Sequence, residues 1–159
     1  INSGLNAGVN VLYSGTVAAA IEGAFFGVTS VAVSLEYDPD ADFQAAAVIA
    51  RDVVGGLVKR SEASGRLFNL NIPTAATLSP PHLSIVPMGL AQYGRTYEKR
   101  QDPGGRDYYW ALWSEPEQPP AEHFDVTALR NGNVTLTPLQ FDLTVKPLLE
   151  SMEDWGLEL

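Results

Sequence analysis

The chain has 159 residues, of which 45% are hydrophobic and 18% are charged, and this composition suits one folded globular domain. A formal net charge of -9 argues against a nucleic-acid duplex or an anionic membrane as the partner, because both bind basic surfaces. The absence of cysteine excludes disulfides and thiolate metal sites.

The first residues, 1–4, contain neither an initiator Met nor the basic and apolar regions of a signal peptide. The chain begins within a predicted secondary-structure element, and we therefore interpret it as a fragment of a longer protein. Residues 28–35 are apolar but far too short to span a membrane. We therefore expect a cytoplasmic protein without a membrane partner.

The first half alternates strand and helix patterns. Residues 1–5 fit the end of a strand, and residues 17–26 fit an apolar helix that we expect to be largely buried. Residues 28–35 are β-branched and apolar, as in a strand covered on both faces. A helix over 43–60 and a strand over 67–72 follow. This order predicts a parallel sheet with right-handed crossovers.

The second half has a different character. The turn sequence D-P-G-G at residues 102–105 predicts a long hairpin between residues 97–100 and the aromatic-rich residues 108–113. The other predicted elements are an extended segment at 83–93, a Pro-rich loop at 115–121, extended segments at 134–136 and 139–143, and a short helix at 145–155. The predicted fold is thus α/β, with a Rossmann-like, mostly parallel sheet, helices on both faces, an extended β-hairpin and a carboxy-terminal tail.

A polar turn with the sequence N-A-G-V-N lies at residues 6–10, directly after the first predicted strand. The side chains of Asn6 and Asn10 offer amide oxygens, which are suitable ligands for a hard divalent cation. Ligands bind at this carboxyl edge in most open α/β sheets. The plain alternative is that Asn-x-Gly is only a turn.

The sequence Y-S-G-T at residues 13–16 precedes the alanine-rich helix. Ser14 and Thr16 supply hydroxyl groups, and Gly15 lets an anion approach the backbone closely. The helix start adds free N–H groups and the positive end of its dipole, so a phosphate can be held even in an acidic protein. The alternative is that Ser14 is simply a helix N-cap.

Other polar and aromatic residues are weaker candidates. We interpret His82 and His123 as loop histidines, because no Ser/His/Asp motif accompanies them. The aspartates of residues 38–42 begin like an EF-hand loop but lack its later Gly and Glu, which favours helix capping. The aromatic side chains of residues 108–113 permit base stacking, but oligomer packing is the commoner role of such exposed aromatics.

Several segments, in one order along the chain, resemble the SurE (survival protein E) family of metal-dependent 5′/3′-nucleotidases. They are S-G-L-N-A-G-V-N at 3–10, Y-S-G-T-V-A-A-A-I-E-G at 13–23, V-A-V-S-L at 31–35, N-L-N-I-P at 69–73, R-Q-D-P-G-G-R-D-Y-Y-W at 100–110, residues 125–132, and V-T-L-T-P-L at 134–139 with D-L-T at 142–144. The resemblance therefore extends over nearly the whole chain.

This resemblance implies a role for each residue of the two motifs. Asn6 matches an amide ligand of a divalent metal, Mg²⁺ or Mn²⁺, and Asn10, Ser14, Gly15 and Thr16 match the loop that holds the substrate phosphate. The implied reaction is hydrolysis of nucleoside 5′(3′)-monophosphates to nucleoside and phosphate.

The resemblance also implies a division of the chain. Residues 1–80 match the carboxy-terminal part of the family's α/β nucleotidase core. Residues 81–159 match the hairpin and tail that contribute to subunit association, so we expect a homodimer or homotetramer.

The chain departs from the family pattern at two places. The family's D-D-G aspartate pair and a serine ligand have no match here, so no catalytic residue is assigned and the chain alone is expected to be inactive. Only Val11 and Leu12 separate Asn10 from Tyr13, where the family has a longer connection, commonly including L-G-D-D. Two alternatives to the enzyme stay open: a catalytically incomplete phosphate- or nucleotide-binding protein, and a structural oligomerisation module.

Overall fold

The structure, a computed structural model, describes residues 1–60, 65–90, 94–114 and 123–157. Its centre is a five-stranded sheet in the order β1-β2-β3-β7-β4. The strands are β1 (Asn2–Ser3), β2 (Ser30–Leu35), β3 (Leu67–Ile72), β4 (Leu83–Ile85) and β7 (Val134–Leu139). The first three are parallel, while β7 is antiparallel to β3 and β4 is parallel to β7. The predicted α/β class is confirmed, with a mixed sheet.

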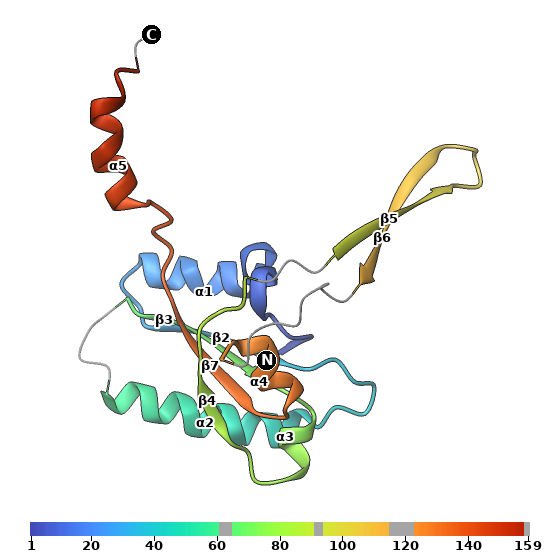
Figure 1. The fold of residues 1–159 in the computed structure, drawn as a ribbon. Coiled ribbons are helices and arrows are strands. Elements are labelled where there is room, and N and C mark those ends of the chain that lie inside the picture. Colours follow the sequence, from blue (N-terminus) through green and yellow to red (C-terminus); the bar gives the residue numbers. More distant parts are fainter. Residues whose placement is uncertain (61–64, 91–93, 115–122, 158–159) are drawn as a thin grey trace.

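Helices cover both faces of this sheet, as predicted, and Figure 1 shows α1 (Gly15–Phe25) and α2 (Phe43–Arg60) on opposite sides of it. The remaining helical elements are short: η1 (Gly8–Tyr13), α3 (Ala75–Leu78), α4 (Asp125–Arg130), α5 (Lys146–Met152) and η2 (Glu153–Trp155). Of these, α5 with η2 confirms the helix predicted for residues 145–155. No described helix is long and apolar enough to cross a membrane.

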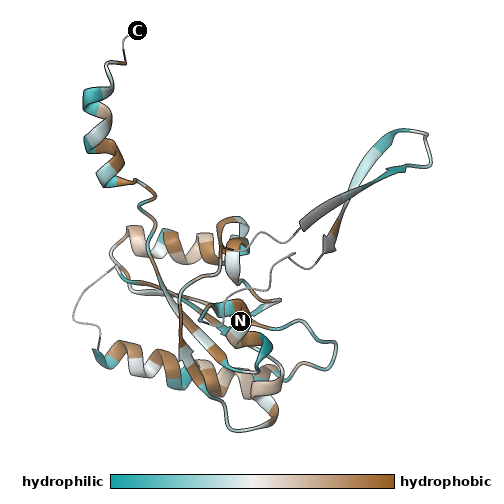
Figure 2. Ribbon diagram, in the orientation of Figure 1, coloured by the Kyte–Doolittle hydropathy of each residue, from teal (hydrophilic) through white to brown (hydrophobic). Residues whose placement is uncertain are grey.

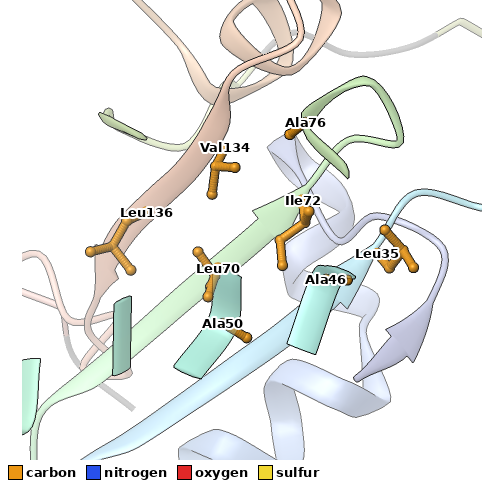
Figure 3. Packing of buried hydrophobic residues seen from close by; sticks show 8 residues of the cluster. All are labelled: Leu35, Ala46, Ala50, Leu70, Ile72, Ala76, Val134 and Leu136. Atoms are coloured by element: carbon orange, nitrogen blue, oxygen red, sulfur yellow. The ribbon is translucent and has the colours of Figure 1, made fainter. Parts of the chain in front are cut away.

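The face covered by α2 carries the larger hydrophobic core. Leu70, Ile72 and Leu35 are fully buried, and Ala46 and Ala50 of α2 face them (Figure 3). Alanine at these two helical positions lets the helix backbone lie close to the strands. Burial of each Leu or Ile side chain contributes about 1.5–3 kcal/mol, so this face supplies much of the stability of the fold.

The face covered by α1 is packed more narrowly. Val17, Ala20 and Ala24 of α1 are buried, whereas Phe25 is 60% and Phe26 is 78% exposed. The prediction that this helix is largely buried is therefore wrong for the described residues, because only one side of α1 rests on the sheet. Figure 2 shows hydrophobic residues on the sheet and on both large helices.

The predicted hairpin is confirmed as β5 (Gly94–Gln101) paired antiparallel with β6 (Asp107–Ser114), and it lies away from the main sheet in Figure 1. Its turn is closed by Asp102, whose Oδ1 accepts hydrogen bonds from the N–H groups of Gly104 at 2.8 Å and Arg106 at 2.9 Å. The predicted Pro-rich loop at 115–121 lies outside the described residues. Residues 134–139 form the single strand β7.

Acid should weaken the hairpin turn. The pKa of Asp102 lies below its usual value, first because the backbone N–H of Arg106 donates to its carboxylate, and also because Gly104 and the Arg106 side chain do so. A lowered pKa in the fold stabilises the turn above the unfolded value of about 3.9, and this contribution is lost as the pH falls through the folded value.

We therefore expect the amide resonances of Gly104 and Arg106 to shift toward unstructured values between about pH 5 and pH 2. In Asp102→Asn, this acid-dependent change should disappear. Constant resonances across that range in the native protein would contradict the prediction.

Candidate functional site

The carboxyl ends of β1, β2 and β3 share one edge of the sheet, and the chain that leaves β1 turns back across the neighbouring strands there. Gly4 and Gly8 have φ angles of 103° and 57°, a left-handed conformation that glycine adopts without steric cost. The intervening turn places Asn6 over β2 and β3, where it contacts residues from both strands.

Asn6 is held through both its backbone and its side chain. Its N–H donates to Oδ1 of Asn71 at 2.8 Å, and its carbonyl oxygen accepts from Nδ2 of Asn71 at 3.0 Å and of Asn69 at 2.7 Å. Its own Nδ2 donates to Oγ of Ser34 at 2.7 Å. Among the described residues nothing donates to Oδ1 of Asn6, which is the atom of this amide that can bind a cation.

The polar side chains beneath Asn6 form a buried layer on the sheet. They alternate with the leucines and isoleucine of the opposite core, and each is at most 3% exposed: Ser34, Asn69, Asn71, Thr135 and Thr137. Within the described structure, Oδ1 of Asn69 and Oγ1 of Thr135 have no hydrogen-bond partner. An unsatisfied buried polar atom costs about 1–3 kcal/mol, so this layer stabilises the fold less than an apolar layer would.

A buried carboxylate ties this turn to the rest of the site. Asp125 is 0% exposed, and its Oδ2 accepts from the N–H of Gly8 at 2.8 Å. Its Oδ1 accepts from the N–H groups of Gly89 and Val126, both at 2.8 Å. A Cβ at Gly89 would lie 3.2 Å from Oδ1 of Asp125, closer than most such contacts, so glycine suits this approach. Asp125 thereby joins the turn, the segment after β4 and the start of α4.

The six residues of η1 connect the polar turn to α1 in a compact way. A 3₁₀-helix rises only about 2.0 Å per residue, so it advances less than an extended chain would. Val11 of η1 is 7% exposed and packs in the α1-side core, and its carbonyl oxygen accepts from the N–H of Ser14 at 3.4 Å. The short Asn10-to-Tyr13 connection therefore has a defined helical geometry.

The start of α1 has the geometry of a capped helix. Oγ of Ser14 accepts from the N–H of Val17 at 3.1 Å, which confirms the N-cap alternative for this residue. The cap leaves the hydroxyl proton of Ser14 free to be donated. In an α-helix the first N–H groups have no intrahelical acceptor, so those of Gly15 and Thr16 remain for a ligand. A cap and an anion site are compatible here.

The predicted site residues do not all face one hollow. Asn10 lines a hollow of about 230 Å³ with Glu36 and residues of α4, whereas Ser14 lines a separate apolar groove of about 770 Å³ between α1 and the end of β7. No hydrogen bond of the described residues joins Asn6 to residues 14–16. The assignment of Asn10, Ser14, Gly15 and Thr16 to one phosphate loop stays a prediction.

Two aspartates of residues 38–42 have structural roles. Asp42 caps α2, because its Oδ1 accepts from the N–H groups of Gln44 and Ala45, both at 2.9 Å. Oδ1 of Asp38 accepts from the N–H of Asp40 at 2.8 Å, which closes a turn. Within the described part of the chain, no group of three or more His, Asp or Glu side chains is placed to hold a metal. The assignment of Asn6 as a metal ligand stays a prediction.

The sheet, the polar turn and the capped helix start together define a Rossmann-like α/β protein with a candidate ligand site at the carboxyl edge of its parallel strands. The family model described as Survival protein SurE matches residues 1–95. The chain belongs to the SurE family.

Similar proteins agree with this assignment. The chain is 72% identical over 157 residues to a 5′-nucleotidase SurE of Rhodopirellula baltica, covering 99% of this chain and 62% of that protein. It is 40% identical over 151 residues to a 5′-nucleotidase SurE of Syntrophomonas wolfei, covering 94% and 57%. The crystal structure of the SurE protein from Aquifex aeolicus matches with a TM-score of 0.84 at 30% identity, covering 99% and 63%. The chain thus spans less than two thirds of the length of these relatives.

Replacing Asp125 by Asn should loosen the turn. One carboxylate oxygen would become an NH₂ group that faces a backbone N–H, so a charged hydrogen bond would be lost. In the full-length protein that contains this chain, we expect the free energy of unfolding to fall by about 1.5–3 kcal/mol in urea denaturation. Asp52→Asn is the control, because Asp52 is exposed and pairs only with Arg51 in the described contacts. Equal stability of the two variants would contradict the role of Asp125.

Proposed function

We propose that the full-length protein is a metal-dependent phosphomonoesterase that hydrolyses nucleoside 5′(3′)-monophosphates to nucleoside and phosphate. The observation that carries the proposal is the fixed amide of Asn6, whose Oδ1 has no donor among the described residues and lies at the carboxyl edge of the parallel strands. The relatives named 5′-nucleotidase SurE support the same reaction class.

The donor set suits a hard divalent cation such as Mg²⁺ or Mn²⁺. Oδ1 of Asn6 is a neutral oxygen ligand of the kind these ions accept, and this chain contributes no thiolate that would favour softer metals. Carboxylate ligands would come from the family's D-D-G segment, which has no match in this chain. When bound, the metal would polarise a phosphoryl oxygen and activate water.

The chain's own residues would then hold the phosphate. The N–H groups of Gly15 and Thr16 and the hydroxyl proton of Ser14 are donors at the positive end of the α1 dipole. A Cβ added at Gly15 would meet nothing within 4 Å, so the space above this helix start is open to a ligand. In this mechanism Asn71 and Asp125 do not touch substrate; they fix the turn that carries Asn6.

Asn6→Ala tests the assignment of the metal ligand. In the full-length protein, we expect Mn²⁺-dependent release of phosphate from AMP or GMP to fall about 100-fold or more, because a metal ligand is lost. Asn131→Ala removes an exposed asparagine at the end of α4 and should leave turnover unchanged.

Turnover of the Asn6→Ala variant at the native rate would refute the assignment. Mn²⁺ and phosphate binding without turnover in the native full-length protein would instead favour the catalytically incomplete binding protein.

We also propose that residues 81–159 mediate assembly into a homodimer or homotetramer. The hairpin exposes aromatic side chains, with Tyr109 66% and Trp110 52% exposed, and the tail helix α5 exposes Leu149 at 57%. Aromatic side chains are enriched at protein–protein interfaces, so their exposure here favours a contact with another subunit. Residues 83–85 and 134–139 of this segment are strands of the main sheet and residues 125–130 pack against β7, so the segment is not only an assembly module.

Deleting residues 100–110, with a short Gly-Ser replacement, should reduce the oligomer mass measured by light scattering, because the exposed aromatic strand is removed. The doubly substituted Arg51→Ala, Asp52→Ala variant, altered on the surface of α2, should keep its native mass. An unchanged mass after the hairpin deletion would remove the assembly role of the hairpin.

A further inference from the structure

A metal-binding asparagine must present the correct end of its amide. The two ends differ chemically, because Oδ1 can bind a cation and Nδ2 cannot. A half-turn of the terminal torsion exchanges them with little steric change. An asparagine ligand therefore benefits from a neighbour that binds Nδ2 and leaves Oδ1 outward.

In this structure the neighbour of Nδ2 is Ser34. The distance from Nδ2 of Asn6 to Oγ of Ser34 is 2.7 Å, and Ser34 is 0% exposed near the carboxyl end of β2. The Asn6 backbone is fixed separately by Asn69 and Asn71, on strand β3. The terminal torsion of Asn6 is therefore left for Ser34 to set.

The composition of the buried layer supports a functional origin. Ser34 and Ala32 share one face of β2, and Ala32 shows that an apolar residue is accommodated on this face. A wholly apolar layer would avoid the unsatisfied Oδ1 of Asn69, whose Nδ2 donates to the carbonyl oxygen of Asn6. Polar groups that cost stability are most often found where they serve a site.

We propose that Ser34 is a positioning residue that orients the Asn6 amide with its oxygen toward the metal. This inference rests on the proposed function, because it takes Asn6 as the metal ligand. The Ser34 hydroxyl could also donate to Oδ1, but the rotated amide would then turn its NH₂ group toward the cation. The hydrogen bond with Ser34 therefore fixes the plane of the amide, and within that plane a bound cation selects the orientation in which Ser34 accepts from Nδ2 and Oδ1 faces the metal.

The test measures Mn²⁺ binding to the full-length protein by calorimetry, without substrate. In Ser34→Ala we expect the Mn²⁺ dissociation constant to rise about 10- to 100-fold, the usual effect of removing a group that orients a metal ligand. Ser34→Thr keeps the hydroxyl and suits a strand, so it should restore the affinity to within a few-fold of native.

Thr135→Val is the matched control. Thr135 is equally buried in the same layer, and its hydroxyl has no partner among the described residues, so its removal should leave the Mn²⁺ affinity unchanged and the melting temperature equal or higher. An equal loss of affinity in Ser34→Ala and Thr135→Val would show a general effect of the layer and overturn the proposal. This comparison is decisive even if Ser34→Thr is overpacked and unstable.

Asn6→Ala separates the two proposals. If Asn6→Ala weakens Mn²⁺ binding while Ser34→Ala binds like the native protein, the ligand assignment stands and only the positioning role of Ser34 fails. If Asn6→Ala itself binds Mn²⁺ with native affinity, the metal assignment of the proposed function fails as well. A weakened Ser34→Ala that Ser34→Thr restores supports both.

Discussion

The hydrogen bonds that fix the Asn6 turn against a buried polar layer are the constraint on which the rest of the site depends. A turn that crosses strand ends must find partners for its N–H and C=O groups, because unpaired backbone groups out of water are costly. Here Asn71 binds both the N–H and the carbonyl group of Asn6, much as a neighbouring strand would. The carboxylate of Asp125 accepts from the N–H of Gly8, so both ends of the turn are held by buried side chains.

The two faces of the sheet differ in composition. The α2 face is filled by Leu35, Leu70 and Ile72, which supply hydrophobic burial. The α1 face is apolar at one end, around Val17, and polar at the other, beneath Asn6. Because side chains alternate along a strand, β2, β3 and β7 present apolar residues to the α2 face and the buried polar residues to the α1 face.

Much of the fold was predictable from local patterns, whereas the residues that hold the Asn6 turn in place were not. Strand β2 follows from its continuous β-branched, apolar run, β3 from period-two alternation and helix α2 from helical spacing, and Asn6 and Ser14 stood out by motif. Asp125 did not, because it lies 117 positions from Gly8 and its neighbours form a helix too short for periodicity to reveal. Asn69 and Asn71 alternate with apolar residues, a pattern typical of a solvent-facing side, whereas in the structure the Asn6 turn binds both side chains on the face that α1 also covers.

The central claim is that the amide oxygen of Asn6 binds a divalent metal while Ser34 and Asn71 hold the residue in place. A crystal structure of the full-length protein with Mg²⁺ and phosphate tests it directly. We expect Mg²⁺ at about 2.1 Å from Oδ1 of Asn6, with Nδ2 still hydrogen-bonded to Ser34 and the phosphate at the start of α1. A metal bound without Asn6, or a phosphate far from Ser14, would contradict it.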